Sequence, residues 1–131
     1  MSNVVSTVQE IYSAFGRGDA PAILARLADD VVWETEGPAI ISFTGTRHGI
    51  TETKGFFEAI GKDHETPMLN MSDFVASGDT VAAIGRYEAT MKATGKRVNT
   101  PVAHYWKFRD GKIARYSGFI NSAAFVEALR A

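Results

Sequence analysis

The residue in this sequence that could take part in the most kinds of chemistry is His104. It alternates with Trp106 and Phe108 in a strand-like stretch, and alternation places all three side chains on one face. We expect that face to be the buried, apolar one. A neutral histidine there can donate one hydrogen bond to a ligand oxygen, or act as a general acid or base, because its ordinary pKa lies near neutrality. The alternative interpretation is a core histidine that is hydrogen-bonded to a neighbouring side chain or to water.

Arg86 and a glutamate are the other candidates for chemistry. Arg86 alternates with Ile84, and we expect both to point inward. A buried guanidinium requires a carboxylate, which belongs either to Glu34, Glu36 or Glu88 or to an acidic ligand. In the second case Arg86 holds negative charge, and Glu36 or Glu34, near the mouth of the cavity, takes a proton.

Aromatic and polar side chains around these residues are expected to line a cavity. The set comprises Tyr12, Trp33, Phe43, Phe57, Ile84, Trp106, Tyr116 and Asn121. Aromatic walls with few polar groups are typical of a site for a small, mostly apolar oxygenated molecule, and also of an ordinary packed core. The Asn121 amide can orient a ligand or cap the helix that follows it.

Composition excludes several classes of function. The 131 residues carry a net charge of -1 without a basic cluster, so we expect neither nucleic acid nor a membrane as partner. There is no cysteine, the three histidines lack the spacing of a metal site, and no glycine-rich nucleotide motif is present, so we expect no metal and no cofactor. Residues 1–6 do not resemble a signal peptide, which together with the lack of cysteine favours a cytoplasmic location.

Apolar periodicity and turn signals predict one α+β domain over residues 1–131. Helices are expected at 4–15, after Asp19, at 50–60 and after Ser122, with short strands at 31–33 and 40–43. Four longer strands follow at 68–77, 80–93, 98–108 and 112–119, joined by glycine-containing turns. Three hairpins in series form an antiparallel meander, and the helices should pack on one face of it.

Three segments carry a resemblance to a known family: residues 18–33, residues 45–57 and residues 94–113, the last including the hairpin FRDGKI. The chain resembles the SnoaL-like, ketosteroid-isomerase-related branch of the nuclear transport factor 2-like (NTF2-like) superfamily. The resemblance implies a cone-shaped, strongly curved, mostly antiparallel six-stranded sheet wrapped around three N-terminal helices, plus a short C-terminal helix and a pocket at the open end. It also implies a homodimer through the outer sheet face, with which an exposed set of Tyr87, Met91 and Tyr105 is compatible.

The resemblance also shows where this chain departs from the ketosteroid isomerases. Those enzymes use an aspartate base and an oxyanion hole made by a tyrosine and a protonated aspartic acid. The corresponding positions hold Thr35, Ile11 and His104, with Tyr12 one residue further along the helix. We therefore expect no efficient steroid isomerisation. The sequence favours a protein that binds a small oxygenated molecule, with acid–base isomerase, cyclase or dehydratase chemistry as one possibility. The alternative is a non-catalytic binding or stress-response module, or an accessory subunit.

Overall fold

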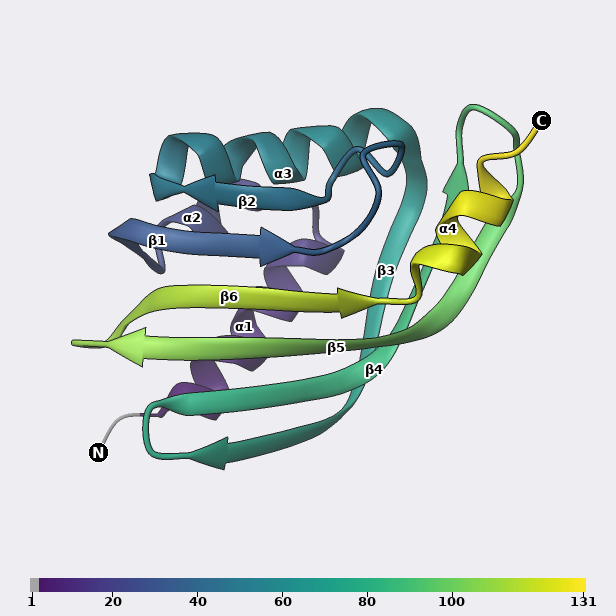
Figure 1. The fold of residues 1–131 in the computed structure, drawn as a ribbon. Helices are drawn as coiled ribbons and strands as arrows, with labels where there is room; N and C mark the ends of the chain where they lie inside the picture. Colours follow the sequence, from purple (N-terminus) through teal and green to yellow (C-terminus); the bar gives the residue numbers. More distant parts are fainter. Residues whose placement is uncertain (1–2) are drawn as a thin grey trace.

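The chain folds into four helices and one six-stranded sheet, described by a computed structural model for residues 3–131 (Figure 1). The helices are α1 (Val4–Gly16), α2 (Ala20–Leu24), α3 (Gly49–Asp63) and α4 (Ser122–Ala128). The strands are β1 (Leu27–Thr35), β2 (Gly45–His48), β3 (His64–Ser77), β4 (Thr80–Met91), β5 (Arg97–Arg109) and β6 (Lys112–Ile120). The predicted α+β class is confirmed.

The sheet has the order β2-β1-β6-β5-β4-β3. All neighbours are antiparallel except β1 and β6, which run parallel. Figure 1 shows a strongly bent sheet, with α1 and α3 packed on one side of it and α4 lying across one end. The buried apolar side chains of the helices and of this concave face form a single core. The same face therefore holds the space in which a ligand site can form.

The meander follows from the turn chemistry of the sequence. Asp110 and Gly111, between β5 and β6, have φ angles of 52° and 78°, as a two-residue hairpin turn requires. Gly78 and Gly95 supply the positive φ of the two preceding turns. The three predicted hairpins are confirmed by the pairings of β3 with β4, β4 with β5, and β5 with β6.

The prediction of a short strand at 40–43 is wrong. Residues 39–43 form turns, and β2 begins only at Gly45. Ile41 and Phe43 are nevertheless buried, and the Thr44 hydroxyl donates to the carbonyls of Pro38 and Ile41 to fix the turn. A turn that buries two alternating apolar side chains has the same sequence pattern as a strand, which explains the error.

The expected facing of β4 is also wrong, by one residue. Ala83 is paired with His104, so it is the odd-numbered residues of β4 that share the inner face. Ile84 and Arg86 consequently lie on the outer face and are exposed. Tyr87 and Met91, expected outside, are buried, and of that set only Tyr105 is on the outer face. Because side chains alternate with a period of two, a shift of one residue exchanges both faces of a strand.

A substitution at Gly85 tests the close contact between the backbones of β3 and β4. A Cβ at this position would clash with the Asn70 carbonyl and would lie 2.5 Å from the Met71 Cα, and backbone atoms there cannot move aside cheaply. We expect Gly85→Ala to lower the free energy of unfolding by about 1–3 kcal/mol, as overpacking does.

Gly61→Ala is the matched control, measured in the same urea titrations. Gly61 lies in α3 with nothing within 4 Å of the added methyl group. This change should raise stability by roughly 0.5–1 kcal/mol, since alanine is the better helix former. Equal effects of the two substitutions would contradict the assigned pairing of β3 with β4.

Candidate functional site

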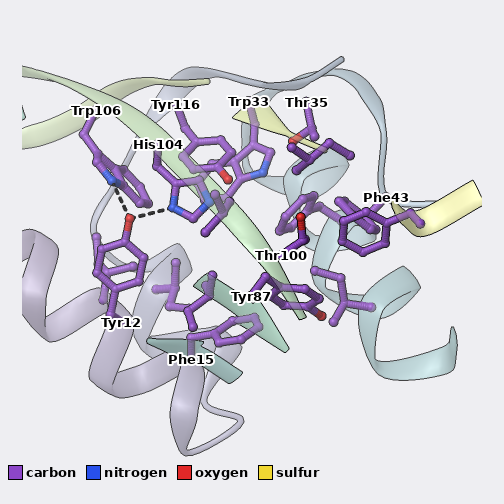
Figure 2. A pocket seen from close by; sticks show the side chains of 18 of the residues that line it. Tyr12, Phe15, Trp33, Thr35, Phe43, Tyr87, Thr100, His104, Trp106 and Tyr116 are labelled. Atoms are coloured by element: carbon purple, nitrogen blue, oxygen red, sulfur yellow. Dashed lines mark hydrogen bonds between the residues drawn. The ribbon is translucent and has the colours of Figure 1, made fainter. Parts of the chain in front are cut away.

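A cavity of about 50 Å³ lies between the concave face of the sheet and α1, α3 and α4 (Figure 2). Its wall is mainly aromatic and aliphatic. The lining residues are Ile11, Tyr12, Phe15, Ile23, Trp33, Thr35, Phe43, Phe56, Ile60, Leu69, Tyr87, Thr100, Pro101, Val102, His104, Trp106, Tyr116, Ile120 and Phe125. None of these carries a carboxylate, an ammonium or a guanidinium group. In the described part of the chain, the cavity wall therefore carries no positive charge unless His104 is protonated.

A chain of two hydrogen bonds joins α1 to β5 inside this wall. The Trp106 Nε1–H donates to the Tyr12 hydroxyl over 3.1 Å, and the Tyr12 hydroxyl lies 2.6 Å from Nδ1 of His104. Figure 2 shows both bonds meeting at the Tyr12 oxygen. The Tyr12 ring also stacks on the His104 ring, with centroids 5.7 Å apart. The helix residue therefore fixes the position of two strand residues.

This network determines where the proton of His104 resides. The Trp106 indole can only donate, so the Tyr12 oxygen accepts from it, and the single Tyr12 hydroxyl proton is free to bond to His104 Nδ1. We therefore assign the proton of a neutral His104 to Nε2, because the other tautomer would leave the Tyr12 hydroxyl proton without an acceptor. Burial lowers the pKa of His104 to about 3, so the ring is neutral at pH 7, and burial raises the pKa of Tyr12 above its usual value.

The Nε2–H group of His104 has no hydrogen-bond partner among residues 3–131. It is on the side of the ring away from Tyr12, in the direction of Trp33 and Tyr116 (Figure 2). Three polar atoms of the wall are fully buried without a partner within the described chain, namely Trp33 Nε1, Thr35 Oγ1 and Thr100 Oγ1. Buried polar atoms are usually paired, so three unpaired ones in the wall of one cavity make that cavity a candidate site for a ligand or for ordered water.

Gly118 makes room for the polar side of the wall. It is paired with His104 on one side and with Thr35 on the other. A Cβ at Gly118 would lie 2.6 Å from the Tyr116 hydroxyl and 3.1 Å from Thr35 Oγ1. The Tyr116 hydroxyl therefore lies over the glycine, close to Thr35. Desolvation raises the pKa of Tyr116 well above its usual value, and the nearby Tyr12 raises it further, whereas the Tyr116 and Thr35 hydroxyls do not reach hydrogen-bond geometry.

A second buried pair lies towards α4. Nδ1 of His64 is 2.6 Å from the Tyr87 hydroxyl, and Phe43 and Phe125 pack against the His64 ring. Burial lowers the pKa of His64 to about 4 and raises that of Tyr87. Tyr87 lines the cavity, whereas His64 supports it from behind.

Two of the three residues expected to do chemistry lie elsewhere. Arg86 is exposed on the outer face, where it donates to the side chain and the carbonyl of Asn99. Glu36 is exposed in the loop after β1, and Glu34 accepts from Arg115 on the outer face. The expectation of an inward arginine and of a glutamate at the cavity is therefore wrong, and His104 is the only member of that trio in the wall.

Of the expected wall residues, Tyr12, Trp33, Phe43, Trp106 and Tyr116 line the cavity. Phe57 is displaced by its neighbour Phe56, although it still packs on Trp33. Ile84 is on the outer face, and Asn121 is the N-cap of α4, accepting from the Ala124 amide.

Sequence reasoning did not identify Thr35, Tyr87 or Thr100 as lining residues. Thr100 shares the inner face with His104 by alternation, and Thr35 occupies the position of the catalytic base of the ketosteroid isomerases, so both carry a signal in the sequence that could have identified them. The expected facing of β4 places Tyr87 on the outer face of the sheet, so the sequence does not identify it as a lining residue.

The SnoaL-like domain family matches residues 8–116, and the chain therefore belongs to that family. Two NTF2-like proteins of known structure are similar over the full length of both chains. The one from Burkholderia pseudomallei K96243, whose function is unknown, is 29% identical with a TM-score of 0.90, and the one from Burkholderia thailandensis E264 is 27% identical with a TM-score of 0.91.

A third structure, TerC co-crystallised with polyporic acid, is 24% identical over 98% of each chain with a TM-score of 0.85, and shares the fold. No curated protein matches this sequence. Among residues 3–131, no helix is long and apolar enough to cross a membrane, and no group of three or more acidic or histidine side chains could hold a metal ion.

The two buried histidines make stability depend on pH. Both are neutral in the folded protein at pH values where the unfolded chain, with an ordinary pKa of 6.5, binds a proton. The free energy of unfolding should therefore be constant between about pH 7.5 and pH 9, below the range in which tyrosines ionise, and fall as the pH decreases from about 6.5 to about 4.5, by up to about 1.4 kcal/mol per pH unit for each histidine.

Urea unfolding at a series of pH values measures this slope. His104→Gln should reduce it by about half. His48→Gln, at an exposed histidine, is the matched control and should leave it as in the wild type. A slope that is the same in all three proteins would show that His104 does not contribute.

Proposed function

We propose that this protein binds a small, mostly apolar molecule through an oxygen atom that accepts a hydrogen bond from His104 Nε2. The observation that carries the proposal is the hydrogen-bond chain from Trp106 through Tyr12 to His104, which leaves one N–H group of fixed orientation without a partner in an aromatic cavity. A neutral donor in a neutral wall suits a carbonyl, an ether or an un-ionised hydroxyl, because a buried anion would lack a compensating charge.

The same arrangement limits the chemistry. A carbonyl oxygen bonded to His104 Nε2 is polarised, which favours addition at the carbonyl carbon or enolisation at the carbon next to it. A base to remove a proton is not provided by the lining residues other than His104 itself, and a histidine with a pKa of about 3 is a weak base at neutral pH. Binding with polarisation is thus favoured over rapid isomerase turnover.

The proposal is tested with two pairs of cyclic ligands of similar size, 2-cyclohexenone with cyclohexene and phenol with toluene, in each of which only the first carries an oxygen. We expect 2-cyclohexenone and phenol to bind and His104→Phe to weaken that binding by about 10-fold, which corresponds to about 1.4 kcal/mol for a lost hydrogen bond. The affinity for cyclohexene and toluene should change little. Isothermal titration calorimetry measures all four.

His104→Gln is the matched variant, because its amide retains an N–H donor at a similar reach. It should preserve more of the affinity for the oxygenated pair than His104→Phe does. If His104→Phe weakens both members of each pair equally, or if no oxygenated compound binds the wild type, the proposal fails.

We also propose that two chains associate through the outer face of the sheet. Ile84, Ala103 and Phe119 are lateral neighbours on β4, β5 and β6, and Ile84 and Phe119 are 47% and 59% exposed. Val75 and Tyr105 extend this patch. An apolar patch shared by four strands supports a two-fold contact between identical faces.

Static light scattering tests the association. The wild type should have the mass of a dimer, and the double change Ile84→Lys with Phe119→Lys should give a monomer. Glu58→Lys, at an exposed position on α3, is the control that adds positive charge away from the patch and should remain dimeric. A monomeric wild type would refute the assignment.

A further inference from the structure

A second space lies directly beside the cavity. This outer hollow, of about 150 Å³, is formed by the end of α1, by α2, by α3 and by the start of β3. Phe57 and Pro67 contribute to its wall, and Gly18 and Gly61 lie exposed at its rim. Three residues line both spaces, namely Phe15, Ile23 and Ile60. These shared side chains are the partition between the cavity and the outer hollow.

The volumes show why the partition matters. An engineered protein cavity that binds benzene measures roughly 150 Å³, and one water molecule occupies about 30 Å³ of liquid. At about 50 Å³, the cavity beside His104 therefore holds a molecule of a few atoms but not a ring. The outer hollow alone has the volume that a six-membered ring needs. A ring-sized ligand that reaches His104 must occupy both spaces.

Of the three shared side chains, Phe15 is the one placed to move. Ile23 and Ile60 are 1% and 5% exposed and are held in the core. Phe15 is half-buried in the last turn of α1 and is followed by Gly16 and Gly18, beside which there is open space. Gly18 has a φ of 70°, and the chain reverses there into α2. A rotation of Phe15 therefore meets less packing than a displacement of either isoleucine.

We infer that the outer hollow is the outer part of the ligand site and that the Phe15 ring separates it from the cavity until a ligand displaces it. This inference rests on the proposed function and specifies its ligand as a neutral cyclic ketone or phenol. The oxygen is bonded to His104, and the ring body extends past Phe15 towards Phe57. The carboxylate at the hollow, Asp19, already caps α2 through the Ala22 amide, and it disfavours an anionic ring body.

Association kinetics test the role of Phe15. Both tryptophans of the chain line the cavity, so their fluorescence reports its occupation in a stopped-flow experiment. The probe is 1-indanone, a bicyclic ketone. Phe15→Ala should accelerate its association by about 10-fold or more, and Phe15→Trp should slow it by a similar factor. Acetone, which is small enough for the cavity alone, should bind the wild type with an affinity that His104→Phe weakens by about 10-fold, as for the other oxygenated ligands.

Leu24→Ala is the matched control, because Leu24 is half-buried in α2 and lines neither space. It should leave the association rate of 1-indanone unchanged. Phe15→Leu, which keeps more apolar bulk than Phe15→Ala, should give an intermediate rate and decides the matter if Phe15→Ala does not fold.

Two results separate the inference from the function on which it rests. If 1-indanone binds with a dependence on His104 but its association rate is the same in every Phe15 variant, the partition is overturned and the proposed function stands. If neither the wild type nor any Phe15 variant binds 1-indanone or acetone, both are overturned.

Discussion

The hydrogen-bond chain from Trp106 through Tyr12 to His104 is the interaction on which the site depends. It connects a helix to a strand that is more than 90 residues away in the sequence, and it does so inside an aromatic wall where every unpaired polar group is costly. Without Tyr12, the Trp106 N–H and His104 Nδ1 would both lack partners, and the proton of His104 would have no preferred nitrogen. The helix therefore sets the chemistry of the strand.

The rest of the wall is arranged around that fixed donor. Tyr116 stacks on Trp33 with ring centroids 3.9 Å apart, and its hydroxyl lies over Gly118 beside Thr35. Replacement of an ionisable base by Thr35 and of an acid by His104 gives a cavity whose polar groups donate and accept without carrying charge. Such a wall offers no charge to compensate a buried ion, and this is a property of the wall as a whole and not of one residue.

The sequence was a good guide where local chemistry decides structure. The Asp110–Gly111 turn, the Asp19 cap and the periodicity of α1 each have a local cause, and their elements are found where expected. The facing of β4 could not be predicted in this way, because both of its faces carry alanine and aliphatic residues. Which face points inward depends on the pairing of Ala83 with His104 across a five-residue loop. That pairing is determined by tertiary structure, and it places Arg86 outside the site and Tyr87 in the cavity wall.

The parallel pairing of β1 with β6 has a consequence for how the protein is made. Trp33 and Tyr116 are partners in that pairing, and more than 80 residues separate them in the chain. A ribosome adds these residues at about 5–20 per second, so the first aromatic layer waits for several seconds before its partner strand emerges. During that interval Trp33 and the aromatic side chains of α3 lack the strand that covers them. The last strand to be synthesised is therefore the one that covers the exposed apolar side chains of the nascent chain and completes the cavity wall.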